Sequence, residues 1–340
     1  MRSDLVDFLC DPIDHSNLTL SLATTGDDGD IQSGVLSSES GRQYPIVDGI
    51  PRFVRCIETA RGVASFGNEW NYFNYDLFKI NWLTHVVAHT FGTTDVFRDK
   101  VIVDCGAGSG MQSKWMAELG AERVIALELS HSVDGVMRRN LAGMMNVDIV
   151  QCSIDQPPLK SGCIHGIVIC HNVIQHTPSV EDTARALWRC VGTGGEFAFN
   201  CYMKYPDDWV WSLRWRLVYR PMRAFLSRRS FQTALAYAKT MACLRFVPLL
   251  GTILERAQFV VCGDVPQGPD QVRRQYKSAV LNTFDWYGSH QFQHQKSKEE
   301  IRALVSELQP DETLRRNVEA YLTRQIPPGL AMRLAKSTES

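Results

Sequence analysis

The stretch Val101–Gly110, VIVDCGAGSG, constrains the fold of this 340-residue chain more than any other. A short apolar run ends at Asp104, and glycines then recur at Gly106, Gly108 and Gly110. An apolar run closed by alternating glycines predicts a buried strand that turns sharply into a helix. Glycine suits such a turn because a residue without Cβ adopts positive φ and lets a ligand approach the backbone. The stretch therefore predicts a nucleotide-type pocket at the carboxyl edge of a doubly wound sheet.

Two kinds of cofactor use a turn of this type. The nicotinamide and flavin fingerprint G-x-G-x-x-G would need a third glycine where Met111 stands. The chain carries D-x-G-x-G-x-G, which resembles motif I of the class I S-adenosylmethionine (SAM)-dependent methyltransferases. The resemblance implies that the three glycines bind SAM and that Asp104 holds the region of its amino group. A tight strand–helix turn without any ligand is the alternative.

A second acidic residue stands at the end of the next predicted strand. Arg123–Leu127 is apolar enough for a buried strand, and Glu128 closes it, 24 residues after Asp104. This separation fits a strand–helix–strand unit. The resemblance implies that Glu128 accepts hydrogen bonds from the ribose hydroxyls of the cofactor. A glutamate that merely lies on the surface at a strand end is the alternative.

The third predicted strand, residues 148–150, leads into the loop QCSIDQPP. Methyltransferases of this class carry an acidic residue here that reaches the adenine amino group. Ser153 occupies the position where that acid is most often found, and Asp155 follows two residues later. The resemblance thus assigns Asp155, with the backbone of Ile154, to adenine binding.

The fourth predicted strand, residues 165–170, is followed by HNVIQHTP, which is similar to the loop after strand four in the same class. Histidine is the side chain whose ordinary pKa suits a general base near neutral pH. His171 and His176 are therefore predicted catalytic residues, with structural roles as the alternative. Gly192, Gly194 and Gly195 make a turn into a fifth strand over residues 196–202. The order of these motifs predicts an α/β fold: a doubly wound, Rossmann-like, seven-stranded methyltransferase sheet.

Composition limits the class of protein further. The chain has 44% hydrophobic and 21% charged residues and a formal net charge of -1, which fit an ordinary globular enzyme and give no overall attraction to nucleic acid. No apolar run is long enough to span a membrane, and the N-terminus does not resemble a signal peptide. Ten cysteines occur without a C-x-x-C pair, as expected for reduced thiols. These features predict a cytoplasmic protein.

Residues 1–57 are predicted to form a small α+β domain. Its segments Leu5–Cys10 and YPIVDGIP resemble the zinc-ribbon-like activator subunit of tRNA and translation-factor methyltransferases. A ribbon would carry four cysteines where this chain has Cys10, Ile13, Ser37 and Ser40. One thiolate cannot hold a tetrahedral zinc ion. The resemblance therefore implies a degenerate, metal-free ribbon that serves for packing or docking.

Two further segments flank or interrupt the predicted core. Before it, SFGNEWNYFNY is aromatic-rich and reads as a helix, with Tyr75 a predicted acceptor-side residue. After strand five, residues 205–265 are predicted to form a helical insertion or lid. Between residues 209 and 261 this insertion has nine lysines and arginines, one acid (Glu255) and the aromatics Trp209, Trp211, Trp215, Tyr219 and Phe225. We expect Trp209 on the acceptor side; a dimer face, a membrane-surface helix pair and a nucleic-acid patch are alternatives for the insertion.

The predicted division of the chain is thus 1–57, 58–204 (the SAM-binding core), 205–265 and 266–340. The last part carries His290 and His294 as acceptor-side candidates, a helix opened by Ser297 with Glu300, and two final strands within residues 313–336.

Three functions from different classes compete. The first is SAM-dependent O- or S-methylation of a small molecule, including a small thioether acid. The second is methylation of RNA or protein, against which the near-neutral charge and the lack of an N/D-P-P-Y loop stand. The third is a regulatory subunit without activity. The first predicts SAM as cofactor, a small-molecule acceptor as partner and neither metal nor nucleic acid; a homodimer stays open.

Overall fold

The computed structural model describes residues 1–26, 29–54, 61–204, 208–263, 265, 270–288, 292–309, 311–323 and 329–338. They fall into two compact units. The core unit comprises residues 1–59, 74–202 and 292–340, and the helical unit comprises residues 60–73 and 203–291. The predicted insertion 205–265 lies within the helical unit, which also takes in the aromatic segment before Phe73 and continues to Gln291.

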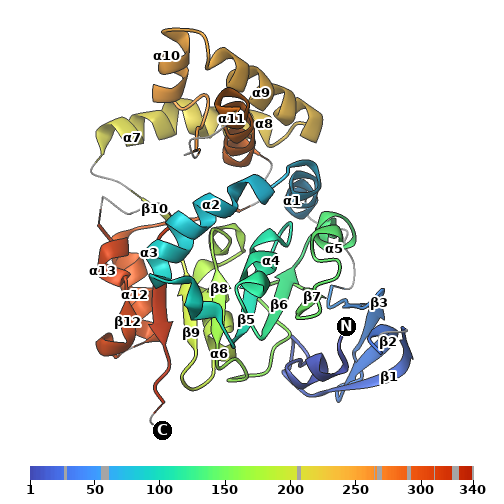
Figure 1. Cartoon of the computed structure of the whole chain (residues 1–340). Coiled ribbons are helices and arrows are strands. Elements are labelled where there is room, and N and C mark those ends of the chain that lie inside the picture. The colour runs from blue at the N-terminus through green and yellow to red at the C-terminus, as the bar shows by residue number, and fades with distance from the viewer. Residues whose placement is uncertain are drawn as a thin grey trace. The chain divides into compact units, whose positions relative to one another are not determined.

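A seven-stranded sheet forms the centre of the core unit (Figure 1). Its strand order is β12-β13-β9-β8-β5-β6-β7. The strands are β5 (Val101–Cys105), β6 (Arg123–Glu128), β7 (Val147–Gln151), β8 (Ile167–Cys170), β9 (Glu196–Phe199), β12 (Arg315–Arg316) and β13 (Met332–Ala335). Strands β7, β6, β5, β8 and β9 run parallel, and β13 is antiparallel to β9. The predicted doubly wound α/β sheet is confirmed, including its two final strands.

The helices that connect these strands are α4 (Met111–Glu118), α5 (Val136–Asn140), α6 (Val180–Cys190), α12 (Lys298–Leu308) and α13 (Val318–Tyr321). The helix after the glycine turn, α4, and the helix opened by Ser297, α12, lie where the sequence predicts them. Ser179 caps α6 by accepting from the N–H of Asp182, and Ser297 with Glu300 forms the predicted capping box of α12. The predicted fifth strand is shorter than expected: β9 ends at Phe199, and Tyr202–Met203 forms a separate strand, β10, paired with β11 (Gln295–Lys296).

A long helical segment covers one face of the sheet ahead of β5. It runs through Asp76–Phe78, α2 (Lys79–Asn81), the π-helical turn Trp82–Val87 and α3 (Ala88–Phe91). Trp82 is buried between Phe97 and Trp115, with ring centroids 5.8 Å and 5.5 Å away. Its indole N–H donates to Oε1 of Gln112 at 3.2 Å, so this segment is fixed to the first turn of α4. A short helix, Thr94–Phe97, leads into β5.

The N-terminal residues form a four-stranded antiparallel sheet, β1-β2-β3-β4, preceded by a short helix at Ser3–Asp7. The strands are β1 (Leu18–Thr25), β2 (Ile31–Ser38), β3 (Gln43–Val47) and β4 (Ile50–Pro51). This module packs on the β7 edge of the large sheet, where the N–H of Phe53 donates to the carbonyl of Gln151 at 2.9 Å. This contact pairs the backbone of β7 at Gln151 and covers part of an otherwise exposed sheet edge.

A buried ion cluster ties the same module to the opposite end of β6 and β7. The guanidinium of Arg123 donates to Asp148 at 2.9 Å and to Asp4 at 2.6 Å, and Arg2 donates to Asp148 at 2.9 Å. Arg123 and Asp148 are each 4% exposed. Because a buried charge is costly without its partner, this cluster fixes the N-terminal segment on the sheet.

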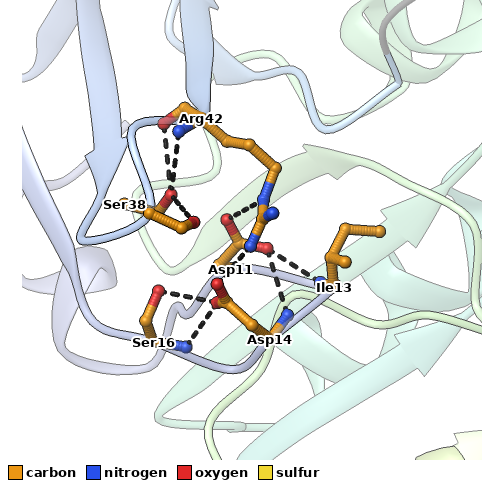
Figure 2. Close-up of polar contacts among 7 residues, drawn as sticks. Asp11, Ile13, Asp14, Ser16, Ser38 and Arg42 are labelled. Carbon is orange, nitrogen blue, oxygen red and sulfur yellow. Dashed lines mark hydrogen bonds and ion pairs between the residues drawn. The ribbon is translucent and has the colours of Figure 1, made fainter.

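Arg42 joins the loop over residues 11–16 to the loop over residues 38–42 (Figure 2). Its Nε donates to Asp11 at 2.7 Å, and its guanidinium also pairs with Asp14. The N–H of Ile13 donates to Asp11 at 2.8 Å, and Ser16 donates to Asp14. Burial by itself would raise the pKa of Asp11, but the hydrogen bonds from Arg42 and Ile13 hold it below its ordinary value. Ion pairs thus join these loops, and the zinc-ribbon resemblance stays a prediction.

The helical unit consists of α1 (Arg61–Tyr72), a helical segment over α7 (Trp209–Arg214), a π-helical turn (Trp215–Tyr219) and α8 (Arg220–Leu226), then α9 (Phe231–Leu244), α10 (Leu250–Arg256) and α11 (Gln271–Tyr287). Its main cluster packs Ala234, Leu235 and Ala238 of α9 against Val280 and Phe284 of α11. This packing explains why residues up to 291 belong with the insertion and not with the predicted C-terminal part. No described helix is both long and apolar enough to cross a bilayer.

We predict that Arg42→Met lowers the free energy of unfolding clearly more than Asp14→Asn does, because it leaves the fully buried Asp11 carboxylate without its guanidinium. Urea unfolding followed by circular dichroism measures this difference. Asp14→Asn is the control: the Asp14 side chain is 38% exposed, so the loss of its ion pair should lower stability much less. Equal effects of the two substitutions would contradict the inference that the ion pair of Arg42 with Asp11 contributes most to stability.

Candidate functional site

The turn after β5 has the conformation that its glycines predict. Gly106, Gly108 and Gly110 all have positive φ, at 76°, 59° and 77°. A Cβ on Gly106 would lie 2.4 Å from Cγ1 of Val173, and one on Gly110 would lie 3.0 Å from Met137. Any side chain at Gly106 would displace the loop after β8. The turn therefore needs glycine for backbone conformation and for close packing together.

Glu128 connects this turn to the end of β6. Its Oε2 accepts from the N–H of Gly108 at 2.8 Å, and its Oε1 accepts from the N–H of Ser130 at 2.8 Å. The residue is 6% exposed. Each carboxylate oxygen can accept two hydrogen bonds, so each has one further lone pair beyond the backbone contact. This arrangement fits an acid that receives two adjacent ribose hydroxyls.

Asp104 lies at the carboxyl end of β5 and is 5% exposed. The hydroxyl of Ser113, in the first turn of α4, donates to its Oδ2 at 2.6 Å. Burial raises the pKa of Asp104 to about 6; the hydrogen bond from Ser113 opposes this, and the charge of Glu128 adds to it. Asp104 and Glu128 are thus two buried acids whose charges interact, and a cationic ammonium group would suit them. The two carboxylates and the glycine turn together fit SAM.

The N-terminal module contacts residues of and beside the loop that follows Glu128. The sequence analysis did not predict these contacts. The guanidinium of Arg52 pairs with Asp134 at 2.5 Å and donates to Oε1 of Gln151 at 2.8 Å. The carboxamide of Gln151 in turn donates to the carbonyl of Leu129 at 3.2 Å. Gln151 is fully buried. Arg52, which lies outside the matched methyltransferase residues, thus helps to hold the loop after Glu128 in place.

The predicted adenine residues lie in the loop after β7. Ile154 is buried, and Asp155 is half-buried with the hydroxyl of Ser153 donating to it. Asp155 also lines an open pocket of about 380 Å³ together with Pro12, His15, Arg185 and Arg189, among others. None of the glycine-turn residues lines that pocket. The adenine role of Ile154 and Asp155 therefore stays a prediction.

The loop after β8 brings two histidines to the carboxyl edge of the sheet. Nε2 of His171 lies 3.2 Å from the carbonyl oxygen of Gly329, and Nδ1 of His176 lies 3.0 Å from that of Phe292. A carbonyl accepts only from N–H, so in the neutral imidazoles these nitrogens carry the proton and the other ring nitrogen has the lone pair. Burial lowers the pKa of His171 to about 4, with the Gly329 carbonyl opposing this. His171 is thus neutral at pH 7.

Residues around these histidines include functional candidates that the sequence did not reveal. Gln175 is fully buried, and within the described part of the chain neither Nε2 nor Oε1 of its carboxamide has a hydrogen-bond partner. The backbone carbonyl of Gln175 accepts from the backbone N–H of His294 at 2.8 Å, so the predicted His294 does lie beside the β8 loop. Asn172 has φ of 59° and exchanges hydrogen bonds with Asn200, at 2.6 Å and 2.7 Å.

The other predicted acceptor-side residues are Tyr75, Trp209 and His290. Tyr75 is half-buried and packs against the cluster around Trp82. Trp209 belongs to the helical unit and is 73% exposed. His290 lies outside the described residues. For all three an acceptor role stays a prediction.

Comparison with known proteins agrees with this geometry. The family described as "Methyltransferase domain" matches residues 103–199, from β5 to β9. A ubiquinone biosynthesis O-methyltransferase of Erwinia tasmaniensis is 24% identical over 136 residues, which cover 40% of this chain and 53% of that protein. The corresponding enzyme of Escherichia coli K12 is 26% identical over 112 residues, covering 33% and 46%. The chain thus spans about half the length of the curated relatives it matches.

A solved SAM-dependent methyltransferase of Mesorhizobium loti is 22% identical over 30% of this chain and 46% of its own, with a TM-score of 0.28, too low to support inference. The sequence match and the observed fold agree over residues 103–199, which match a methyltransferase domain and have the strand order of the Rossmann-like class. SAM is the cofactor that such a domain implies. Among the described residues, no cluster of histidine, cysteine, aspartate and glutamate is arranged to hold a metal.

We predict that Glu128→Gln weakens binding of S-adenosylhomocysteine by at least tenfold. The amide replaces one acceptor oxygen with a donor that must face the N–H of Gly108 or Ser130, so a buried donor loses its partner. Isothermal titration calorimetry measures the affinity. Glu122→Gln, an exposed glutamate beside the other end of β6, is the control and should bind like the wild type. Unchanged affinity in Glu128→Gln would rule out the ribose role.

Asp104 gives a prediction about pH. Its raised pKa means that the folded protein holds this proton up to about pH 6, whereas the unfolded chain releases it near 3.8. The contribution of Asp104 to the free energy of unfolding is therefore present below pH 4 and lost as pH rises to about 6, a change of up to about 3 kcal/mol. Asp104→Asn should remove this dependence, so that the variant exceeds the wild type in stability more at pH 7 than at pH 4. Denaturant unfolding at both pH values tests it.

Proposed function

We propose that the chain is a SAM-dependent methyltransferase that transfers a methyl group to an oxygen of a small-molecule acceptor. The observation that carries the proposal is the pairing of Glu128 with the backbone of Gly108 and Ser130 within a matched methyltransferase domain. The names of the curated relatives, which methylate oxygen, support the choice of atom. Nine described cysteines are free thiols, which supports a reducing compartment such as the cytoplasm.

In this proposal the residues at the edge of β5 and β6 hold the cofactor. Asp104 receives its ammonium group, and Glu128 receives its ribose hydroxyls. The backbone amides of the glycine turn lie beside it, in the positive-φ conformation that Gly106, Gly108 and Gly110 adopt. When bound, SAM supplies a methyl group on a sulfonium, which is already activated for transfer. The protein therefore has to align an acceptor atom and exclude water.

We assign different roles to the two histidines. His171 is neutral across the physiological range, and a group with a pKa near 4 is a weak base. We assign it the positioning of the acceptor through the lone pair of Nδ1. His176, whose Nδ1–H is directed to Phe292, presents Nε2 as the proton acceptor for a phenol or hydroxyl. Gln175 immediately precedes His176, and its buried carboxamide is suited to hydrogen-bond the oxygen of the methyl acceptor.

The second function favoured by a particular observation is S-methylation of a thioether acid. A thioether needs no base, so the low pKa of His171 would be irrelevant to its rate. Methylation of RNA or protein and a regulatory role without activity are the remaining alternatives. Each predicts a different response in one assay.

The deciding experiment measures transfer from methyl-labelled SAM to phenols, catechols, hydroxy acids, thioether acids and RNA. We expect label in a phenol or catechol, loss of transfer in Glu128→Ala, and at least a hundredfold lower kcat in His176→Ala with little change in KM. His165→Ala, an exposed histidine bonded to the Thr193 carbonyl near the opposite end of β8, is the matched control.

Several outcomes would overturn this proposal. Label only in thioether acids, with His176→Ala fully active, would assign S-methylation. Label only in RNA would assign nucleic-acid methylation. Binding of S-adenosylhomocysteine without transfer to any acceptor class would favour a regulatory protein, and no binding by folded protein would reject the cofactor itself.

A further inference from the structure

The first helical segment of the helical unit exposes an apolar stripe. Residues 209–226 form one continuous helix, since Arg214, Tyr219 and Arg220 at its internal junctions all have right-handed helical φ and ψ. The side chains at spacings of three, four and eight residues lie along one side of this helix. They are Trp209, Val210, Leu213, Leu217 and Phe225, with Trp209 73% and Leu217 67% exposed.

A second apolar set lies at the start of α10. Phe246, Val247, Leu249, Leu250 and Ile253 are exposed, Leu249 by 82%. The guanidinium of Arg214 in α7 donates to the carbonyl of Arg256 at the end of α10, at 3.2 Å. The two apolar sets therefore belong to helices in direct contact. Proteins that act as free monomers rarely expose large contiguous apolar patches.

Exposed arginines lie in the same helix as the apolar stripe and directly after it. Arg216, Arg220, Arg228 and Arg229 are exposed, and the guanidinium of Arg229 lies over the ring of Phe225 with its carbon 4.5 Å from the centroid. Nine basic residues and a single acid occur between residues 209 and 261, and that acid, Glu255, pairs with Arg245. This segment is therefore strongly cationic in a chain whose overall net charge is -1.

From this juxtaposition we propose that the helix 209–226 lies on the surface of a membrane that contains anionic lipid. The apolar stripe enters the boundary between headgroups and acyl chains, and the arginines contact lipid phosphates. A helix with one apolar side and a basic polar side binds membranes in this way, through buried apolar area plus attraction to anionic headgroups. The helix lies in the interface and does not span it. The proposal concerns the helical unit alone and does not depend on which acceptor is methylated.

Two other partners fit the same surface less well. Binding of single-stranded RNA relies on aromatic rings that stack with bases, whereas Val210, Leu213 and Leu217 are aliphatic. A second copy of this chain, related by a twofold axis, would bring two strongly cationic segments of the same composition together. Anionic lipid is the partner whose chemistry matches both the aliphatic and the cationic part of the surface.

The test is flotation of the full chain with phosphatidylcholine vesicles, with and without phosphatidylglycerol. We expect binding to the anionic vesicles and at least a tenfold loss in the double variant Leu213→Glu/Leu217→Glu. The matched control is Leu22→Glu/Met145→Glu, which changes two exposed apolar residues of the core unit and adds the same charge. It should float like the wild type. Affinity for S-adenosylhomocysteine serves as a readout of folding and should be the same in all three proteins.

The arginine contribution is tested separately with Arg228→Gln/Arg229→Gln, which should reduce the preference for anionic over neutral vesicles at least threefold. Absence of wild-type flotation, or equal loss in the control pair, would overturn the proposal. Retention on single-stranded RNA that the arginine substitutions abolish, without vesicle binding, would assign the surface to nucleic acid. A concentration-dependent dimer in light scattering that Leu213→Glu/Leu217→Glu dissociates, without vesicle binding, would assign it to a second copy.

Discussion

The site depends on one interaction, the acceptance of two backbone N–H groups by the buried carboxylate of Glu128. One N–H comes from Gly108 in the turn after β5, and the other comes from Ser130 in the loop after β6. Hydrogen bonds to a charged group are stronger than neutral ones, and a buried charge without them would be costly. The interaction therefore holds two loops from adjacent strands in one arrangement. It does so while leaving acceptor capacity for a ligand.

The N-terminal module contributes to the same arrangement from outside the methyltransferase domain. Its ion cluster with Arg123 and Asp148 fixes it at the amino ends of β6 and β7, and Arg52 reaches Asp134 and Gln151 at the carboxyl ends. The module thus contacts the β7 edge at two points, one near each end of the strand. A packing role for this segment follows from these contacts alone, whatever its relation to zinc ribbons.

Sequence reasoning was most successful where spacing and residue type act together. The glycine turn, Glu128, the capping box of α12 and the final two strands lie where the pattern places them, because each depends on local backbone chemistry. It was less successful with segment boundaries. The predicted insertion ended at residue 265, yet α11 packs on α9 and extends the helical unit to residue 291. An apolar helical face predicts burial but does not name the helix that covers it.

The sequence by itself determined the fold class, the cofactor turn and the acid at the end of β6, since strand–turn–helix geometry leaves few choices for Asp104, the glycines and Glu128. Only the tertiary structure decided which distant groups meet them. Burial beside Glu128 raises the pKa of Asp104, the carbonyls of Gly329 and Phe292 fix the tautomers of His171 and His176, and Arg52 braces the Glu128 loop. These partners are 24 to 158 residues away along the chain, as with Glu128 from Asp104 or Gly329 from His171. Pairing across such separations follows from packing, which no local pattern encodes.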